Sequence, residues 1–384
     1  MDDKELYRQI LGVVAPWKIK EIKLEIDNDR VDIYLEWPYL TDGTCPECGK
    51  TCKIHDRREE RIWRHLDTCQ LKTFIHCSTP RVKCSEHKTK TMEVPWAEDM
   101  SRFTKQFERI AIQFLEASEN RKKTAKNLRL SWDEMNHIMA KAVRRGLERR
   151  ADEPIKYIGM DEKSFLKGQN YVTVMTDTEG KRILDIAQGR TGESVNTLWE
   201  GLTVNQKSGI EAVSMDFWKA FITGAEKHVP GADIVHDRFH IENYLNEAVD
   251  KVRRAEHKEL RTQKDETLTG TKYLWLKSKR NFTKDNKSDF KKLNIDQLAV
   301  GRAWNRKELF RHFWSYKYEG SARKFFKKWY FSATHSRLKP VIDVAKMLKR
   351  HIENILNYVK HKITNAFAEG INSKIQHIKA TARG

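Results

Sequence analysis

Two stretches of similar design, Ile155-Lys-Tyr-Ile-Gly-Met-Asp161 and Ile210-Glu-Ala-Val-Ser-Met-Asp216, decide the fold of the middle of the chain. Each is a short apolar run that ends in an aspartate, which is typical of a buried strand followed by a polar residue. The sequence around them predicts further strands at 171–176, 182–187 and 233–236, and helices at 193–202 and 217–228. Residues 177–180, Asp-Thr-Glu-Gly, predict a hairpin turn between the second and third strands.

This order of elements brings two carboxylates together. Three strands in a meander, followed by helix, strand, helix and strand, is the order of a ribonuclease-H-like α/β core. Its first and fourth strands are neighbours, so we expect Asp161 and Asp216 at one edge of the sheet. Close carboxylates repel each other unless cations lie between them, and Mg²⁺ prefers hard oxygen ligands. The pair therefore predicts a site where two ions activate an attacking oxygen and stabilise a leaving one.

Other acids compete for the same role. Asp237 also follows a strand, so it is an alternative second acid. Glu162 adjoins Asp161 and should point to the opposite face of its strand, which argues against it as a ligand. A single aspartate after a strand is more simply explained as a surface turn or a cap. Two of them, each ending a strand in the right order, favour a site.

A third acid, Glu369, lies on a helical pattern near the C-terminal end of the sequence. The apolar side of this helix carries Phe367, Ile371, Ile375 and Ile378. Another side forms a polar stripe at steps of three and four, which consists of Glu369, Asn372, Gln376 and Lys379. We expect the stripe to face both metal ions and DNA, with Asn372 and Lys379 as DNA contacts. A solvated glutamate is the alternative.

Residues 1–98 contain two knuckles that predict a structural zinc site. The first is Cys45-Pro-Glu-Cys48-Gly and the second is Cys84-Ser-Glu-His87, with alternating, strand-like sequence between them. Zn²⁺ takes four thiolate or imidazole ligands in a tetrahedron, so the predicted set is Cys45, Cys48, Cys84 and His87. Cys52 and His55 compete as the second pair. The remaining Cys69 and Cys77 are interpreted as half-buried strand residues.

Residues 99–152 predict three helices in the order of a helix-turn-helix. A helix over 105–117 precedes a short basic helix over 121–128, and Ser131 suits the N-cap of a last helix that runs to about Arg149. We expect the start of the last helix to meet base edges and the basic side chains to meet phosphates. The candidate DNA contacts are Arg121, Lys122, Lys123, Lys141, Arg144 and Arg145. A three-helix packing module with solvated arginines is the alternative.

The charge of the chain favours a long polyanionic partner. It has 73 Lys+Arg against 54 Asp+Glu, a net charge of +19, and no single tail carries the excess. The sequence from 241 to 360 is basic and predicts a helical insertion. The sequence contains no run of about 18 apolar residues, so it predicts no membrane span. Its acidic N-terminus lacks the form of a secretory signal. We therefore expect a cytoplasmic protein with reduced thiols.

Seven short motifs are spread over nearly the whole chain: Cys45-Pro-Glu-Cys-Gly49, Trp63-Arg-His-Leu-Asp67, Pro80-Arg-Val-Lys-Cys84, Val94-Pro-Trp-Ala97, Gly159-Met-Asp-Glu162, His236-Asp-Arg-Phe-His240 and Asn365-Ala-Phe-Ala-Glu-Gly-Ile-Asn372. On these motifs the sequence resembles the ISL3-family insertion-sequence transposases. The resemblance implies a DDE domain in which Asp161, Asp216 and Glu369 bind Mg²⁺ or Mn²⁺. It also implies that His236, Asp237 and His240 support this site or the DNA. It further implies a bacterial, nucleoid-associated protein. Chains of the family usually continue past a motif like Ala382-Arg-Gly384, so we expect truncation there.

The combined expectation is a multidomain α+β protein. It has an N-terminal zinc-binding β domain, a helix-turn-helix and a ribonuclease-H-like α/β catalytic core with a large all-α insertion. The expected boundaries are 1–98, 99–152, 153–240, 241–360 and 361–384. The expected function is a DNA transposase that binds terminal inverted repeats as a homodimer and catalyses metal-dependent cleavage and strand transfer into target DNA. A sequence-specific DNA-binding regulator and a structure-specific nuclease without strand transfer are the alternatives.

Overall fold

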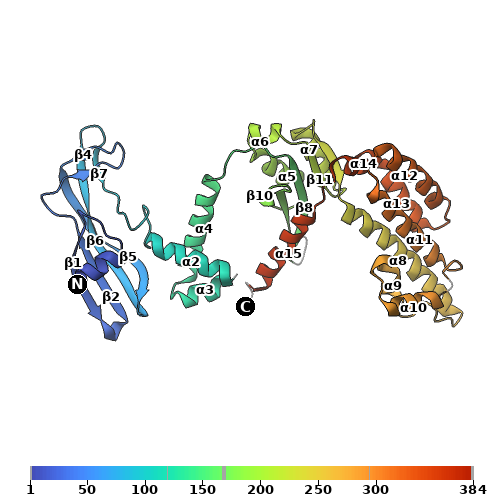
Figure 1. Ribbon diagram of the computed structural model, residues 1–384, viewed down its shortest axis with the longest axis horizontal. Coiled ribbons are helices and arrows are strands. Elements are labelled where there is room, and N and C mark those ends of the chain that lie inside the picture. Colours follow the sequence, from blue (N-terminus) through green and yellow to red (C-terminus); the bar gives the residue numbers. More distant parts are fainter. Residues whose placement is uncertain (1, 119, 167–169, 294, 382–384) are drawn as a thin grey trace. The chain divides into compact units, whose positions relative to one another are not determined.

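The computed structural model describes residues 2–118, 120–166, 170–293 and 295–381. The chain forms two compact units, one of Met1–Arg150 with Ile378–Gly384 and the other of Ala151–His377 (Figure 1). Within the described ranges, no helix has the length and apolar character needed to cross a membrane.

The first unit begins with a twisted sheet in the order β1-β2-β6-β5, with β7 paired to β6. β2 and β6 are parallel and the other neighbours are antiparallel. The bounds are α1 Asp3–Ile10, β1 Lys18–Glu25, η1 Ile26–Asn28, β2 Arg30–Glu36, β3 Gly43–Thr44, β4 Thr51–Cys52, β5 Ile54–Thr68, β6 Leu71–Cys84 and β7 Lys88–Thr91. Its core contains a tryptophan cluster in which the rings of Trp17 and Trp63 both lie edge-on to Trp96. Buried Ile33 and Ile75 complete this core on the paired strands β2 and β6.

Cys69 corrects one expectation for this sheet. It is exposed and adopts a left-handed conformation in the turn between β5 and β6, so it is not a half-buried strand residue. Cys77 lies on β6 as predicted but is fully buried, and burial raises the pKa of its thiol to about 12.

Three helices follow, at the positions that their apolar spacing predicts: α2 Lys105–Ser118, α3 Arg121–Asn127 and α4 Trp132–Glu148. The Ser131 side chain accepts from the backbone N–H of Glu134, and the Glu134 carboxylate accepts from the Ser131 N–H, which is a capping box. The helices enclose a small core whose largest members are Phe103, Phe107, Met135 and Ile138.

The second unit is built on a five-stranded sheet in the order β10-β9-β8-β11-β12. The bounds are β8 Tyr157–Leu166, β9 Asn170–Asp177, β10 Arg182–Gln188, β11 Ala212–Met215 and β12 Asp233–His236. β8, β9 and β10 form the antiparallel meander, whereas β8, β11 and β12 are parallel. The predicted adjacency of the first and fourth strands is therefore confirmed. The predicted end of the first strand at Met160 is wrong, because pairing with β9 carries β8 on to Leu166.

Helices cover both faces of this sheet (Figure 1). On one face lie α5 Gly192–Glu200 and α7 Lys219–His228, which pack Trp199 and Phe221 against Ile158, Met160 and Val213. α6 Val204–Ser208 precedes β11. Ala212 and Val235 face the other way, into the core of the helices that follow β12.

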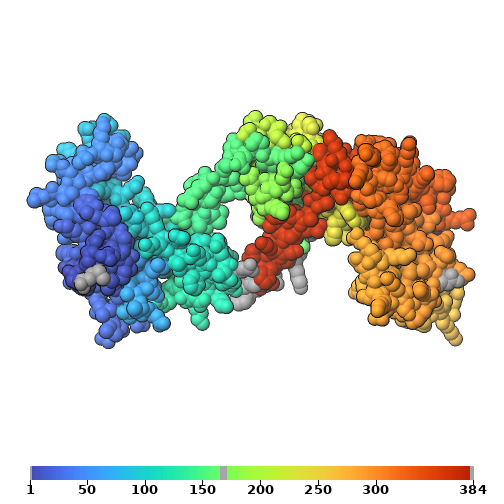
Figure 2. Space-filling model, in the orientation of Figure 1, coloured from blue at the N-terminus to red at the C-terminus, as the bar shows by residue number. Residues whose placement is uncertain are grey.

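Residues 238–361 form an all-helical lobe of the second unit, whose colour runs from yellow through orange toward red in Figure 2. Its bounds are α8 Arg238–Thr262, α9 Lys272–Leu276, η2 Lys279–Asn281, α10 Lys284–Lys292, α11 Ala299–Phe310, η3 Arg311–Ser315, α12 Glu319–Thr334, α13 Lys339–Arg350 and α14 Ile352–His361. Phe326 and Trp329 are buried in its core, so these aromatic side chains pack the lobe. α14 returns to the sheet, where the Asn357 amide donates to the Ile234 carbonyl over 2.9 Å. The last helix is α15 Ala366–Thr381.

Candidate active site and zinc centre

Asp161 lies on β8 at the point where its partner β11 has already ended, since the pairing of these strands stops at Gly159. Its side chain is buried, with 6% of the residue exposed. One carboxylate oxygen accepts from the backbone N–H of Glu162 at 2.9 Å, and the other accepts from the Asn372 amide at 2.7 Å. Burial raises the pKa of Asp161. The fold has thus placed a carboxylate where its charge is unfavourable unless a cation offsets it.

Asp216 follows β11 and is linked to Asp161 through a histidine. Its Oδ1 accepts from the Phe217 N–H at 2.6 Å. The imidazole of His240, on α8, lies between the two acids, with Nδ1 3.4 Å from Asp216 Oδ2 and Nε2 3.9 Å from Asp161 Oδ1. The structure therefore brings together the two predicted aspartates and one of the predicted supporting residues.

Asp237 and Glu369 complete the group of acids. Asp237 is 1% exposed, and its Oδ1 accepts from the Asn365 N–H at 3.3 Å. Burial raises its pKa. Burial also raises the pKa of Glu369, and the charges of Asp237 and Asp161 raise it further. The alternative second acid therefore lies within the same group as Glu369.

Asn365 anchors the start of α15 to this group, a role that sequence reasoning missed. Its amide donates to the Met160 carbonyl at 2.7 Å. Gly159 permits this approach, because a Cβ there would lie 2.8 Å from Asn365 Oδ1. The signal was present in the C-terminal motif, where Asn365 precedes Glu369 by one helical turn.

Glu162 also belongs to this region, although strand alternation places it on the face opposite Asp161. Burial raises the pKa of its carboxyl, and the charges of Asp216 and Asp161 raise it further. Its Oε2 is buried and has no partner among the described residues. Both faces of β8 are near Asp216 here because β11 has ended.

His236 supports the site through packing. It is fully buried at the end of β12, and its ring stacks on Phe217 with 4.1 Å between centroids. Burial lowers its pKa to about 3, so it is neutral at ordinary pH. Since Phe217 directly follows Asp216, this stack holds the segment that carries the second acid.

These residues fit a divalent cation. Asp237 Oδ2, Glu162 Oε2 and Asn372 Oδ1 are buried oxygens that lack partners among the described residues, and such oxygens are the ligands that Mg²⁺ uses. The carboxylates of Asp161, Asp216 and Glu369 are less convergent than the zinc ligands described next. The imidazole of His240 lies between two of them.

The zinc prediction for Cys45, Cys48, Cys84 and His87 is matched by the geometry. Their ligand atoms all lie within 4.8 Å of one another. Among the described residues, this is the group of three or more His, Cys, Asp or Glu side chains that converges closely enough to hold a metal ion. The distances are 3.9 Å from Cys45 Sγ to His87 Nδ1, 3.7 Å from Cys48 Sγ to Cys84 Sγ and 3.7 Å from Cys84 Sγ to His87 Nδ1. A tetrahedron with Zn–S bonds of about 2.3 Å has edges of about this length.

Backbone turns build this zinc centre. Gly49 N–H donates to the Cys45 carbonyl at 2.9 Å, and Gly49 takes a φ of +70°, which closes the first knuckle. Cys84 ends β6, and backbone N–H groups of His87 and Glu86 lower the pKa of its thiol to about 6. Cys52 and His55 lie outside the convergent group, and the His55 ring faces Asp56 instead. The competing pair is therefore not supported.

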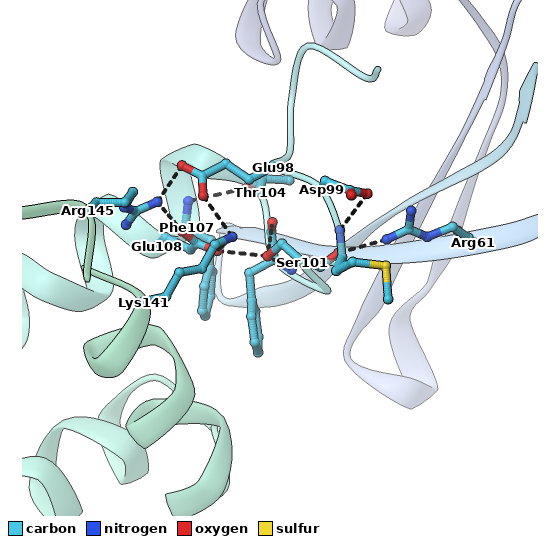
Figure 3. Close-up of polar contacts among 11 residues, drawn as sticks. Arg61, Glu98, Asp99, Ser101, Thr104, Phe107, Glu108, Lys141 and Arg145 are labelled. Atoms are coloured by element: carbon cyan, nitrogen blue, oxygen red, sulfur yellow. Dashed lines mark hydrogen bonds and ion pairs between the residues drawn. The ribbon is translucent and has the colours of Figure 1, made fainter. Parts of the chain in front are cut away.

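The candidate DNA contacts divide into two sets. Lys122, Lys123 and Arg144 are exposed, and Arg121 lies over the Trp132 ring at 5.4 Å from its centroid. Lys141 and Arg145 instead point at Glu98 and Glu108, as Figure 3 shows.

Glu108 explains this inward orientation. It is 2% exposed and also accepts from the Ser101 hydroxyl at 2.7 Å. Burial alone would raise the pKa of Glu98, but hydrogen bonds from Lys141 and Arg145 outweigh it and the pKa is lowered. These two cations therefore neutralise acids inside the unit rather than extend toward DNA.

Two further predicted DNA contacts, Asn372 and Lys379, lie on α15 and differ in their surroundings. Asn372 is buried and its amide donates to Asp161, so in this structure its side chain contacts the acid group. Lys379 is half-buried near the end of the helix.

Comparisons with known proteins agree with this architecture. Residues 158–384 match the sequence profile of the ISL3-type DDE transposases, and residues 41–87 match that of the zinc finger of the IS204/IS1001/IS1096/IS1165 transposases. The transposase of insertion sequence IS1001 from Bordetella parapertussis is 25% identical over 388 residues, covering 99% of this chain and 95% of its own. The IS1557 transposase of Mycobacterium tuberculosis is 24% identical over 414 residues, covering 100% and 93%.

The fold and these matches define a DNA transposase with a zinc-ribbon-like N-terminal region. The chain belongs to the ISL3 family of insertion-sequence transposases.

Proposed function

We propose that this transposase binds the terminal inverted repeats of its insertion sequence, cuts a phosphodiester at each end and joins the freed 3′ ends to target DNA. The carrying observation is the group of buried acids around Asp161, whose pKa values are raised by burial. Acids with raised pKa values that are held together at the edge of a sheet favour a catalytic site over a purely structural one. A DNA-binding regulator has no need of such a group.

The acids are assigned as follows. Asp161, Asp216 and Glu369 hold Mg²⁺ or Mn²⁺, with Asp237 beside them, while the zinc ion at the cysteine knuckles is structural. When bound, the divalent ions polarise the scissile phosphate and lower the pKa of the attacking water. The Asn372 amide and the Glu162 N–H each donate to one Asp161 oxygen, which fixes the orientation of this carboxylate. His240 contacts both aspartates and keeps their spacing.

The chemistry consists of two in-line displacements. In the first, the water oxygen bonds to phosphorus and the bond from phosphorus to the 3′ oxygen breaks, which releases a 3′-OH and a 5′-phosphate. In the second, this 3′-OH attacks a target phosphodiester and displaces another 3′ oxygen, so no bond energy is drawn from a cofactor. The two DNA ends must be held together for joining, which supports a homodimer in the synaptic complex.

Helices α3 and α4 are assigned to the recognition of the repeats as a helix-turn-helix. The N-terminal turn of α4 presents Trp132 and Asp133 at an exposed surface. Exposed Lys122 and Lys123 on α3, and Arg144 farther along α4, supply cations for phosphates.

One assay tests the proposal. The purified protein is incubated with Mg²⁺, a target plasmid and an end-labelled duplex of the terminal repeat that flanks the coding sequence. Joined products are expected from the native protein. Cut but unjoined DNA would indicate a nuclease, and binding without cutting would indicate a regulator.

Asp216→Asn provides the residue-level test. Cutting should fall by more than about 100-fold, since even residues that only orient metal ligands contribute about 10- to 100-fold. Asp185→Asn, an exposed acid on β10 of the same sheet, is the matched control and should cut normally. Unchanged cutting by Asp216→Asn would remove Asp216 from the metal site.

A further inference from the structure

The loop between β10 and α5 carries an arginine to the edge of the acid group. Gly189 takes a φ of +87°, and its N–H donates to the Tyr171 carbonyl at 2.7 Å. The Thr173 hydroxyl donates to the Gly189 carbonyl at 2.8 Å. The Trp218 indole N–H donates to the Arg190 carbonyl at 3.0 Å. Since Trp218 lies two residues after Asp216, these bonds tie Arg190 to both β9 and the segment of the second acid.

The Arg190 side chain is held by aromatic rings. Its guanidinium carbon lies 4.1 Å from the Tyr171 ring centroid and 4.6 Å from the Trp218 ring centroid. Contacts of this kind stabilise a cation and restrict its orientation while its N–H edge stays available. A solvated arginine needs no such contacts, so the two rings indicate that the Arg190 side chain is held in a defined position.

The Arg190 guanidinium does not form a hydrogen bond with the acid opposite it, Glu162. The nearest approach to Glu162 is 3.6 Å from Nη1 to Oε1, which is longer than a hydrogen bond. The guanidinium donates no hydrogen bond to any residue in the described ranges. Glu162 itself is close enough to Asp216 and Asp161 to feel their charges. Arg190 is therefore a fixed cation, with unused donors, one carboxylate away from the candidate metal ligands.

We propose that Arg190 binds a phosphate of the DNA strand next to the phosphodiester that is cut, with Tyr171, Trp218 and Glu162 as positioning residues. A DNA strand that enters this group of acids adds negative charge to it. A guanidinium suits that position because its planar N–H pairs match two phosphate oxygens. This inference rests on the proposed function, since it names a further substrate contact of the same site.

The test combines protein and DNA changes. Native protein, Arg190→Ala and Arg190→Gln are each measured on repeat duplexes in which one phosphate at a time, near the cut, is a neutral methylphosphonate. Arg190→Ala should lower the cutting rate on unmodified DNA by about 10- to 100-fold, as expected for hydrogen bonds to a charged group. At one position the methylphosphonate should cost the native protein a similar factor and cost Arg190→Ala little more. Effects that multiply at every position would overturn the inference.

Controls separate this result from misfolding and from failure of the proposed function. Lys181→Ala removes one exposed positive charge at the other end of β10 and should behave as native protein. Trp218→Phe keeps a ring but loses the indole N–H, and should weaken the contact at the same phosphate only. Binding of the same duplexes with Ca²⁺ in place of Mg²⁺ gives a second readout. If the native protein does not cut, the proposed function fails, yet the methylphosphonate pattern in binding still supports or overturns the Arg190 contact.

Discussion

Replacing three neighbouring cations of α4 should separate folding from DNA binding. Lys141 Nζ lies 2.9 Å from Glu98 Oε2 and 3.2 Å from Glu108 Oε1. Arg145 Nη1 lies 2.5 Å from Glu98 Oε1 and 2.9 Å from Glu108 Oε2 (Figure 3). Arg144, next to Arg145 in sequence, is exposed. We expect Lys141→Ala and Arg145→Ala to destabilise the α2–α4 packing, and Arg144→Ala to weaken DNA binding.

The magnitude follows from the burial of Glu108. Removing one partner of a fully buried ion pair costs about 3–5 kcal/mol. Here the side chains of Lys141 and Arg145 are 19% and 26% exposed, and Glu108 would keep the other cation. It would also keep the Ser101 hydroxyl. We therefore expect a loss of about 1–3 kcal/mol for either variant, and at most about 0.5 kcal/mol for Arg144→Ala.

Hydrogen–deuterium exchange of the full chain measures this loss locally, without assuming that the two units unfold together. Amides of α2 and α4 should exchange about 5- to 150-fold faster in the Lys141 and Arg145 variants, which is the expected energy converted at about 1.4 kcal/mol per factor of ten. The salt dependence of repeat binding should lose about one phosphate contact in Arg144→Ala only. Native exchange together with a reduced salt slope in Arg145→Ala would refute the reasoning.

Two further predictions concern the first unit. Cys48→Ser should lose its zinc by elemental analysis while Cys52→Ser retains it, because Cys52 lies outside the convergent group; equal zinc in both would remove Cys48 from the centre. Burial lowers the pKa of His65 to about 4, so the unfolded chain binds more protons below about pH 6.5 and stability should fall by about 2–3 kcal/mol between pH 6.5 and 4. His65→Gln should flatten this pH dependence in thermal unfolding, and an unchanged dependence would assign it to other groups.

Much of the second unit was predictable because its signals are local. Apolar runs of strand length, separated by helical periods, predict the β-β-β-α-β-α-β order of the core. That order matches the ribonuclease-H-like arrangement, in which the first and fourth strands are neighbours, and the observed pairing of β8 with β11 agrees with it. The zinc ligands were equally accessible, since each knuckle holds two ligands within a few residues.

The contacts that only the tertiary structure decided join distant segments. Asn372 reaches Asp161 from a helix more than two hundred positions away in sequence, and nothing on α15 alone distinguishes that amide from a DNA contact. In sequence, Lys141 and Arg145 belong to a basic face of a helix. Only the tertiary structure shows that they form ion pairs with the buried Glu108 of α2.

The acid group shows the same division. The sequence by itself determined which strands carry Asp161 and Asp216, because periodicity and polarity are properties of neighbouring residues. Only the tertiary structure decided that His240 lies between them and that Asp237, Glu162 and Arg190 gather beside them. The physical reason is that charge pairing and burial depend on which elements pack together, and a side chain finds its partner only after the sheet and its covering helices have formed.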